Sequence, residues 1–561
     1  MTAPVLMVQG TASGVGKSTL VAGLCRLLAR RGLHVAPFKA QNMSNNAAVC
    51  PSGGEIGRAQ YAQAVAAGVE ATVDMNPILL KPQAGAAQVV VLGQVRGVRT
   101  AAEFFAAEPA AAAAAGAQPE DTLWPVVVAA LDRLRAHYDL VVAEGAGSPA
   151  EINLRSRDLA NMRVALHTAA DVLLVADIDR GGAFAALLGT VEWLAPAERA
   201  CVRGFILNQF RGDVSLLQPA PALLEARTGI PTLGVVPHLA DLDLPTEDAA
   251  SLATTATANL PIDEAARLAT AETASLLAVD GAGVAAADAA SVPTTDAARR
   301  ASIAPPGPPL VEIAVVHLPH LSNFDELEPL AREPGVHLRY VRGVADLRAP
   351  DLVILPGTKA TIPDLLWLGE RGLAERIRWL AQHHTPILGI CGGYQMLGRR
   401  VSDPLHAESA IGTAAGLDLL PVETVLGGTK QLARTRGRLH DTVPGFWGQL
   451  GAQPVEGYEI HLGQTMPTVP SPPPVPLLDL GSRSDGAVSL DGWVAGTSVH
   501  GLWERPAPRH ALLHALAAHR GLTWRPSPTP RPDPYDRLAD VLEASLDLSS
   551  LPSLATLRVE R

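Results

Sequence analysis

A glycine-rich run near the N-terminus has the residue types that bind phosphate. It reads GTASGVGKST from Gly10 to Thr19, between an apolar run and a segment with leucines at helical spacing. Loop N–H groups and the start of the following helix favour an anion, Lys17 adds a compact positive charge, and Ser18 can hold a magnesium ion. Five residues separate Gly10 from Gly16, one more than in the standard motif. We expect a nucleotide site here, with contacts from Gly14, Gly16, Lys17, Ser18 and Thr19.

A second run has the form of a nucleophile elbow. The stretch Gly389-Ile390-Cys391-Gly392-Gly393 joins an apolar run to a helical pattern, so the chain should turn sharply and expose the thiol. The start of the helix lowers the pKa of such a thiol. Backbone N–H groups near it can stabilise an oxyanion, and we assign that role to Gly392 and Gly357. The sequence therefore predicts that Cys391 is a nucleophile.

A cysteine nucleophile needs a base, which can lie far away in the sequence. His500 stands out among the 16 histidines because it follows a strand-like segment and lies in the run GTSVHGLWE. His461, in the run GYEIH, is the competing candidate. We expect His500 to be the base.

Polar residues follow several apolar runs that read as strands. In an open α/β sheet, ligands bind at the carboxyl ends of the strands. Glu144 ends one such run, so Ser18 and Glu144 are the candidate magnesium ligands. The amide-rich run from Ala40 to Asn46 is too polar for a core. Beyond the glycine-rich run, the residues assigned to the nucleotide are Lys39 and Asn208, and those assigned to the substrate are Asn42, Asn45, Asn46 and Asp177.

The alternation of apolar runs and helical patterns predicts two α/β domains, each with a mostly parallel sheet covered on both faces. Residues 1–250 form the first, with strands expected at 5–8, 33–38, 139–143, 172–176, 204–207 and 230–236. Residues 251–309 are rich in Ala, Thr, Asp and Pro and are expected to form a flexible linker. Residues 310–561 form the second domain and end in a helical tail.

Composition narrows the class of partner. The net charge of −11 argues against nucleic acid or an anionic membrane as the main partner. No apolar run approaches the roughly 20 residues that span a bilayer, and the four cysteines show no disulfide or metal spacing, so we expect a cytoplasmic protein. Only five of the 45 basic residues are lysines, which suggests that these lysines serve where arginine cannot: Lys17, Lys39, Lys81, Lys359 and Lys430.

These motifs carry a family resemblance. Residues 1–245 resemble the dethiobiotin-synthetase type of P-loop domain, whose loop is also one residue longer than the standard motif. Residues 310–520 resemble a class I glutamine amidotransferase, a flavodoxin-like glutaminase, of the cobyrinate-amidating branch. The runs PFKAQNMSNN, EGAGSPAEINL, DIDRGG and GYEIH are similar to those of the cobyric acid synthase family. Gly14 lies where that family often has Asp, so no side-chain role is expected there.

The resemblance implies an enzyme that uses ATP, Mg²⁺ and glutamine to amidate four peripheral carboxylates of a corrinoid. Many class I glutaminases have Glu two residues after the histidine, but Leu502 stands there, so we expect a Cys–His dyad, with Glu504 as a weak third candidate. The sister enzyme that amidates the a and c carboxylates shares both domains, and the amide-rich run argues against it. A nucleotide-switched scaffold ATPase would leave Cys391 and His500 without a role. The oligomeric state is left open.

Overall fold

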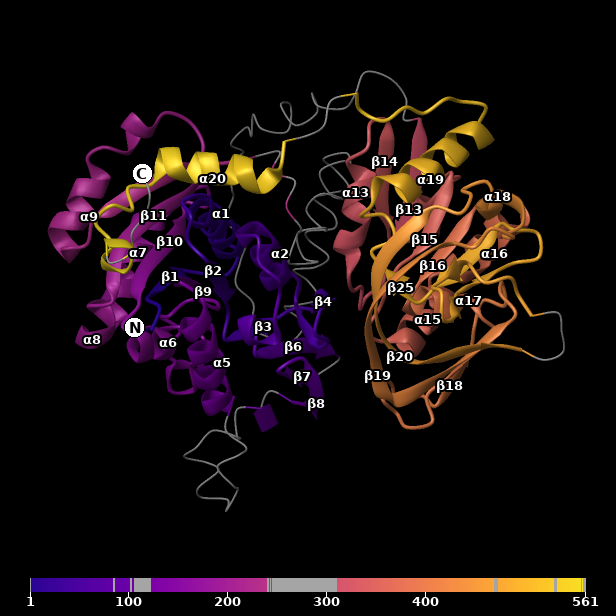
Figure 1. The fold of residues 1–561 in the computed structure, drawn as a ribbon, viewed down its shortest axis with the longest axis horizontal. Coiled ribbons are helices and arrows are strands. Elements are labelled where there is room, and N and C mark those ends of the chain that lie inside the picture. Colours follow the sequence, from indigo (N-terminus) through magenta and orange to yellow (C-terminus); the bar gives the residue numbers. More distant parts are fainter. Residues whose placement is uncertain are drawn as a thin grey trace, which may run out of the picture.

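The computed structural model describes residues 2–83, 86–100, 103–104, 123–239, 242, 244, 310–468, 473–528, 532–555 and 557. The linker predicted at 251–309 lies outside the described residues. The chain forms two α/β domains that lie side by side (Figure 1). Within the described ranges, no helix is long and apolar enough to cross a membrane.

Six parallel strands form the central sheet of the first domain, in the order β12-β11-β10-β1-β9-β2. Both faces of this sheet are covered, because alternate residues of β1 enter different cores: Val5 and Met7 one, Leu6 and Val8 the other. The six predicted strands are all present, and their bounds are β1 (Val5–Gly10), β2 (Val35–Phe38), β9 (Leu140–Glu144), β10 (Asp171–Asp177), β11 (Val202–Phe210) and β12 (Thr232–Pro237).

Helices connect these strands, and the P loop lies between β1 and the first of these helices, α1. α1 begins at Lys17, within the glycine-rich run, and buries Leu20, Leu24 and Leu27 against the sheet. The helices of this domain are α1 (Lys17–Arg30), α2 (Arg58–Ala67), α5 (Leu123–His137), α6 (Met162–Thr168), α7 (Ala183–Trp193), α8 (Pro196–Arg199) and α9 (Ala220–Thr228), with 3-10 turns η1 (Val73–Met75), η3 (Arg155–Arg157) and η4 (Val214–Leu217).

Two small sheets that the sequence analysis did not predict lie between β2 and α5. Figure 1 shows them on the side of the first domain that faces the second. Ala47, Val49, Leu79 and Val90 of these sheets pack against Tyr458 and Ile460 of the second domain, so an apolar core joins the two domains. The strands are β3 (Gln41–Met43), β6 (Ile78–Gln83), β7 (Ala86–Val91) and β8 (Gln94–Arg99) in one sheet, and β4 (Ala47–Val49) and β5 (Glu55–Gly57) in the other.

The second domain has a central sheet in the order β14-β13-β15-β16-β24-β23, in which only the edge strand β23 is antiparallel. The parallel strands follow the order 2-1-3-4-5, which confirms the predicted flavodoxin-like arrangement. Their bounds are β13 (Val311–Val316), β14 (Val336–Val341), β15 (Leu352–Leu355), β16 (Ile387–Ile390), β23 (Ala487–Val488) and β24 (Val494–Thr497). The helices are η5 (Phe324–Leu327), α13 (Glu328–Ala331), α14 (Val344–Leu347), α15 (Thr361–Glu370), α16 (Leu373–Gln382), α17 (Gly392–Leu397), α18 (Gly445–Gly448) and α19 (Pro506–His519).

A long antiparallel hairpin dominates the other sheet of the second domain. β19 (Val422–Leu439) pairs with β20 (Pro454–Pro467), and β20 also pairs with β25 (Val499–His500), which places the predicted base on this sheet. The remaining strands are β17 (Arg400–Ser402), β18 (Thr413–Ala415), β21 (Leu478–Asp479) and β22 (Ser484–Asp485).

The C-terminal tail packs on the first domain, whereas we had assigned it to the second. Helix α20 (Pro534–Ser545) lies along α1, as Figure 1 shows, and the short α21 (Pro552–Ala555) follows it. Arg26 binds Asp536 at 2.7 Å, and a Cβ on Gly23 would lie 2.5 Å from a methyl group of Leu542. Helices α1 and α20 are therefore in close contact, and the tail is part of the first domain.

Candidate active site

The P loop adopts the backbone that its glycines allow. Gly14 and Gly16 have φ of +72° and +91°, a region that other residues rarely enter. Lys17 Nζ donates to the carbonyl oxygens of Ala12 at 2.9 Å and Gly147 at 3.1 Å, so the ammonium group lies over the loop. Asn208 Nδ2 donates to the loop at Val15 O (2.8 Å). The predicted nucleotide residue Asn208 thus also holds the loop in shape.

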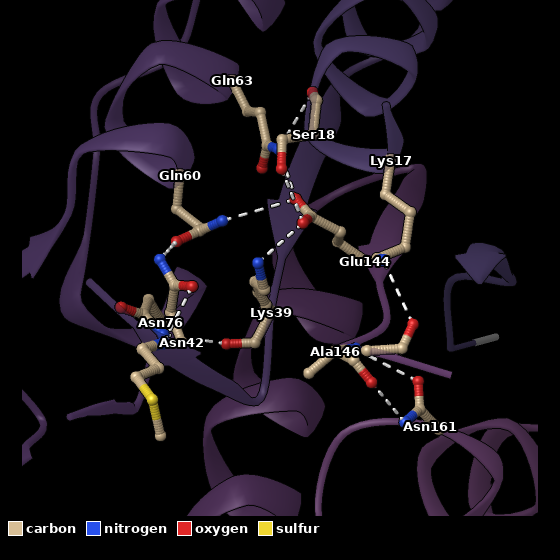
Figure 2. A network of polar contacts seen from close by, with 12 residues as sticks. Lys17, Ser18, Lys39, Asn42, Gln60, Gln63, Asn76, Glu144, Ala146 and Asn161 are labelled. Atoms are coloured by element: carbon tan, nitrogen blue, oxygen red, sulfur yellow. Dashed lines mark hydrogen bonds and ion pairs between the residues drawn. The ribbon is translucent and has the colours of Figure 1, made fainter. Parts of the chain in front are cut away.

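Glu144, at the end of β9, is the centre of a buried polar network (Figure 2). Its Oε1 accepts hydrogen bonds from Ser18 Oγ at 2.8 Å and from Lys39 Nζ at 2.7 Å. Its Oε2 accepts one from Gln63 Nε2 at 2.7 Å. The structure therefore brings together Ser18, predicted from the glycine-rich run, and Lys39 and Glu144, which follow or end two different predicted strands. Gln63 was not predicted, because a glutamine inside helix α2 has no distinguishing signal in one sequence.

The donor set fits a magnesium ion. Mg²⁺ binds oxygen at about 2.0–2.1 Å in octahedral geometry, so two neighbouring ligands lie about 2.9 Å apart. Ser18 Oγ and Glu144 Oε1 are 2.8 Å apart, which matches one edge of that octahedron. In the described part of the chain, no cluster of three or more His, Cys, Asp or Glu side chains could hold a metal. Nucleotide phosphates and water are the usual source of the other ligands.

A cavity of about 570 Å³ extends from the P loop to β3. Its wall includes residues predicted for the nucleotide and the substrate, together with Tyr535 and Leu538 of the C-terminal helix. The predicted residues that line it are Gly14, Gly16, Lys17, Ser18, Thr19, Lys39, Asn42, Glu144 and Asn208.

The four residues predicted to bind the substrate do not form one group. Asn42 lines the cavity and donates to Gln60 Oε1 at 3.0 Å. The side-chain oxygen of Asn45 is buried without a hydrogen-bond partner. Asn46 is 1% exposed and binds the second domain, so its side chain faces a neighbour rather than a cavity. Asp177 ends β10 and pairs with Arg180 at 3.1 Å.

Cys391 lies in a strained turn between β16 and α17, as a nucleophile elbow requires. Its φ of +52° is unusual for a residue with a side chain. Gly393 is needed two residues later, because a Cβ there would lie 1.9 Å from Leu355 O. Burial raises the pKa of the Cys391 thiol, but the attraction of His500, a hydrogen bond with it, and the positive charges of His461 and Lys359 together outweigh burial, and the net pKa lies below the ordinary value. The thiol is thus prepared to ionise.

His500 belongs to a triad, which corrects the dyad that we expected. Its Nδ1 is 2.8 Å from Glu326 Oε1, and both side chains are almost fully buried. Burial lowers the pKa of His500, but Glu326 and Cys391 raise it more, to about 10. Glu504, the weak candidate, pairs with Arg58 at 2.7 Å instead.

The two glycines assigned to the oxyanion hole lie beside the triad. A Cβ on Gly357 would be 3.0 Å from His500 Cε1, and one on Gly392 would be 3.2 Å from the backbone nitrogen of Thr358. Cys391 and Gly392 line a small pocket. The competitor His461 lies in the same pocket, with its Nε2 3.6 Å from Glu459 Oε1. The pocket wall includes Gln88 of the first domain.

The five lysines gather at two places in the structure, in line with the interpretation of the arginine bias. Lys17 and Lys39 are at the nucleotide cavity. Lys81 and Lys430 both pair with Glu55, and Lys430 lines the Cys391 pocket together with Lys359. Burial lowers the pKa of Lys430 to about 8, against the attraction of Glu55. This lysine cluster lies where the two domains meet.

The fold and the two sites define a class: a P-loop nucleotide-binding domain joined to a triad glutaminase. Family models agree, matching a "CobQ/CobB/MinD/ParA nucleotide binding domain" at residues 6–251 and a "CobB/CobQ-like glutamine amidotransferase domain" at 312–508. The chain is 43% identical to the cobyric acid synthase of Moorella thermoacetica, covering 98% of this chain and 97% of that protein. It is 45% identical to that of Desulforudis audaxviator and 44% identical to that of Sorangium cellulosum, with 99% of each chain covered. The chain belongs to the cobyric acid synthase family, the glutamine-dependent amidotransferases of cobalamin biosynthesis.

Proposed function

We propose that this enzyme converts the b, d, e and g carboxylates of adenosylcobyrinic acid a,c-diamide into amides, with ATP and glutamine as co-substrates, in the cytoplasm. One observation carries the proposal. A Cys391–His500–Glu326 triad and a P loop with a buried polar network around Glu144 occur in one chain whose near full-length relatives are cobyric acid synthases.

The triad supports the release of ammonia from glutamine. The Cys391 thiolate attacks the side-chain amide carbon, and backbone N–H groups near Gly357 and Gly392 stabilise the oxyanion. The His500 imidazolium, held by Glu326, gives its proton to the leaving nitrogen, and ammonia departs. The base then takes a proton from water, which hydrolyses the thioester to glutamate and frees the thiol.

The P loop supports activation of the acceptor. A carboxylate is a poor electrophile, so it first attacks the γ-phosphorus of ATP, which yields an acyl phosphate and ADP. Lys17 and the loop N–H groups neutralise charge on the transferring phosphoryl group. Ser18 and Glu144 would hold the magnesium ion, which supplies further charge neutralisation at the phosphates. Ammonia then attacks the acyl carbon and phosphate leaves. Asn42 and Asn45 are the proposed corrinoid contacts.

Mass spectrometry of the product tests the proposal. The enzyme is incubated with the a,c-diamide, ATP, Mg²⁺ and glutamine labelled with ¹⁵N in the side-chain amide, and four labelled amides per corrinoid are expected. Cys391→Ala should make no product from glutamine yet retain synthesis from ammonium chloride, because the nucleophile and the P loop are in different domains. Equal loss with both nitrogen sources would contradict the two-site assignment.

A further inference from the structure

The 3-10 turn η5 carries the triad carboxylate and begins in an unfavourable backbone conformation. Asn323 precedes the turn with φ of +55°, in the left-handed region. Asn enters that region more readily than most residues, but it still needs contacts that keep it there. Asn323, Asp325 and Glu326 are each less than 5% exposed, so these contacts come from packed neighbours and not from water.

The first domain supplies those contacts. Asn323 N donates to Asn46 Oδ1 and Asn323 Nδ2 to Ala47 O, each at 2.8 Å. Arg58 Nε lies 2.6 Å from Asp325 Oδ2, with the arginine side chain 12% exposed. Asp325 is therefore tied to the first domain, while the next residue, Glu326, holds His500.

A second link reaches His500 through Tyr458. Asn323 Nδ2 also donates to Tyr458 OH at 2.8 Å. The Tyr458 ring stacks on the His500 ring, with centroids 5.3 Å apart and planes 15° apart. Glu326 N also donates to Asn323 O at 3.4 Å, so this asparagine contacts both Tyr458 and Glu326, the two neighbours of the imidazole.

The first-domain residues that make these contacts belong to segments that also reach the nucleotide site. Arg58 is the first residue of α2, and Gln63 on the same helix donates to Glu144. Asn46 lies three residues after Met43, which lines the nucleotide cavity. Helix α2 and the amide-rich run therefore connect the nucleotide site to the residues that hold η5.

We propose that Asn323 and the Arg58–Asp325 ion pair are positioning elements, through which the first domain sets the geometry of Glu326 and His500 and so controls glutamine hydrolysis. The inference rests on the proposed glutaminase function. It assigns to Arg58, Asn323 and Asp325 no contact with glutamine and no proton transfer.

Arg58→Gln tests the ion pair in the full-length enzyme. We expect kcat/KM for glutamine hydrolysis to fall at least about 30-fold, the low end of the effect of truncating a buried charge pair, and the ammonia-dependent rate to stay within about threefold. The double variant Arg58→Gln/Asp325→Asn removes the unpaired charge and should recover most of this loss. The matched control is Arg339→Gln, because the Arg339–Glu312 pair has the same 2.6 Å distance but lies within the second domain. Its ratio of glutamine- to ammonia-dependent rates should stay unchanged.

Asn323→Gly provides a second test, since glycine accepts the positive φ and only the side-chain contacts are lost. If the first domain controls the triad, ATP and the acceptor should stimulate glutamine hydrolysis in the wild-type enzyme, and this stimulation should disappear in Asn323→Gly. The alkaline limb of the pH profile should move to lower pH because His500 is less firmly held. If both Arg58→Gln and Asn323→Gly keep the wild-type rate ratio, or the double variant recovers nothing, the inference is overturned. A wild-type enzyme that hydrolyses no glutamine would instead overturn the proposed function.

Discussion

Replacing Glu326 by glutamine should separate the two activities of this enzyme. The side chain keeps its size, but the negative charge next to His500 is lost. With an effective dielectric constant of about 20, two unit charges 2.8 Å apart attract each other by roughly 6 kcal/mol. The amide can still accept one hydrogen bond, so we expect a loss of about 3–5 kcal/mol, which corresponds to a 10²- to 10⁴-fold decrease in kcat/KM for glutamine hydrolysis.

The assay measures glutamate release and ammonia-dependent corrinoid amidation side by side. Ammonia-dependent synthesis should be nearly unchanged in Glu326→Gln, because Glu326 and its partner His500 belong to the second domain. Glu504→Gln is the comparison, since this carboxylate was the candidate from sequence. Its side chain is 45% exposed and is linked to the triad only through Arg58 and Asp325, so a much smaller decrease is expected. A decrease of less than tenfold for Glu326→Gln, or equal decreases for both variants, would refute the assignment of Glu326 to the triad.

The Glu326→Gln variant should also change how the free energy of unfolding depends on pH. The pKa of His500 is raised from 6.5 to about 10 in the fold. The protonated imidazole therefore contributes its full stabilisation of the fold below pH 6.5, and this contribution is lost as the pH rises through about 10. The difference in unfolding free energy between wild type and Glu326→Gln should therefore shrink across that window. Urea titrations at pH 6, 8 and about 10 would measure it, and a difference that grows with pH would contradict the assignment.

Three further predictions concern the first domain. Glu144→Gln should lower ammonia-dependent amidation at least about 100-fold while glutamine hydrolysis without acceptor persists, because the lost charge belongs to the proposed metal site; equal loss of both activities would point to a structural role. Lys17→Arg should lower the amidation rate by a similar factor although the charge is kept, since a planar guanidinium does not fit a loop shaped around a compact ammonium, and a wild-type rate would refute the argument from the arginine bias. Gly23→Ala should destabilise the fold by about 1–3 kcal/mol in thermal unfolding, because the new methyl group meets Leu542 at 2.5 Å. Gly189→Ala, with open space around its Cβ, is the control and should be neutral or stabilising, and adding Leu542→Ala to Gly23→Ala should recover part of the loss.

The strands and motifs of the first domain could be predicted because their signals are local. Each strand of its parallel sheet is a short, nearly continuous apolar run, since both faces of the sheet are covered. The P loop and the Cys391 elbow are equally local. The long hairpin β19–β20 was missed because β19 is rich in polar residues and has several exposed positions, so it does not read as a buried strand.

The features that could not be predicted depend on contacts between distant residues. Glu326 is 174 positions from His500 and lies in a short turn that has no periodicity of its own. Asp536 is 510 positions from Arg26, so nothing near α20 in the sequence shows that the tail packs on the first domain. The role of Asn46 between the domains could not be recognised either, because a polar run after a strand is equally typical of a ligand site.

The packing of α20 on the first domain also bears on when this protein can complete its fold during synthesis. The face of α1 that contacts Leu538 and Leu542 belongs to a helix that leaves the ribosome among the first thirty residues, whereas its partner is made more than 500 residues later. Domains generally fold in order as they emerge. By this order, the apolar strip of α1 beside the P loop should stay without its partner helix until the second domain has been made.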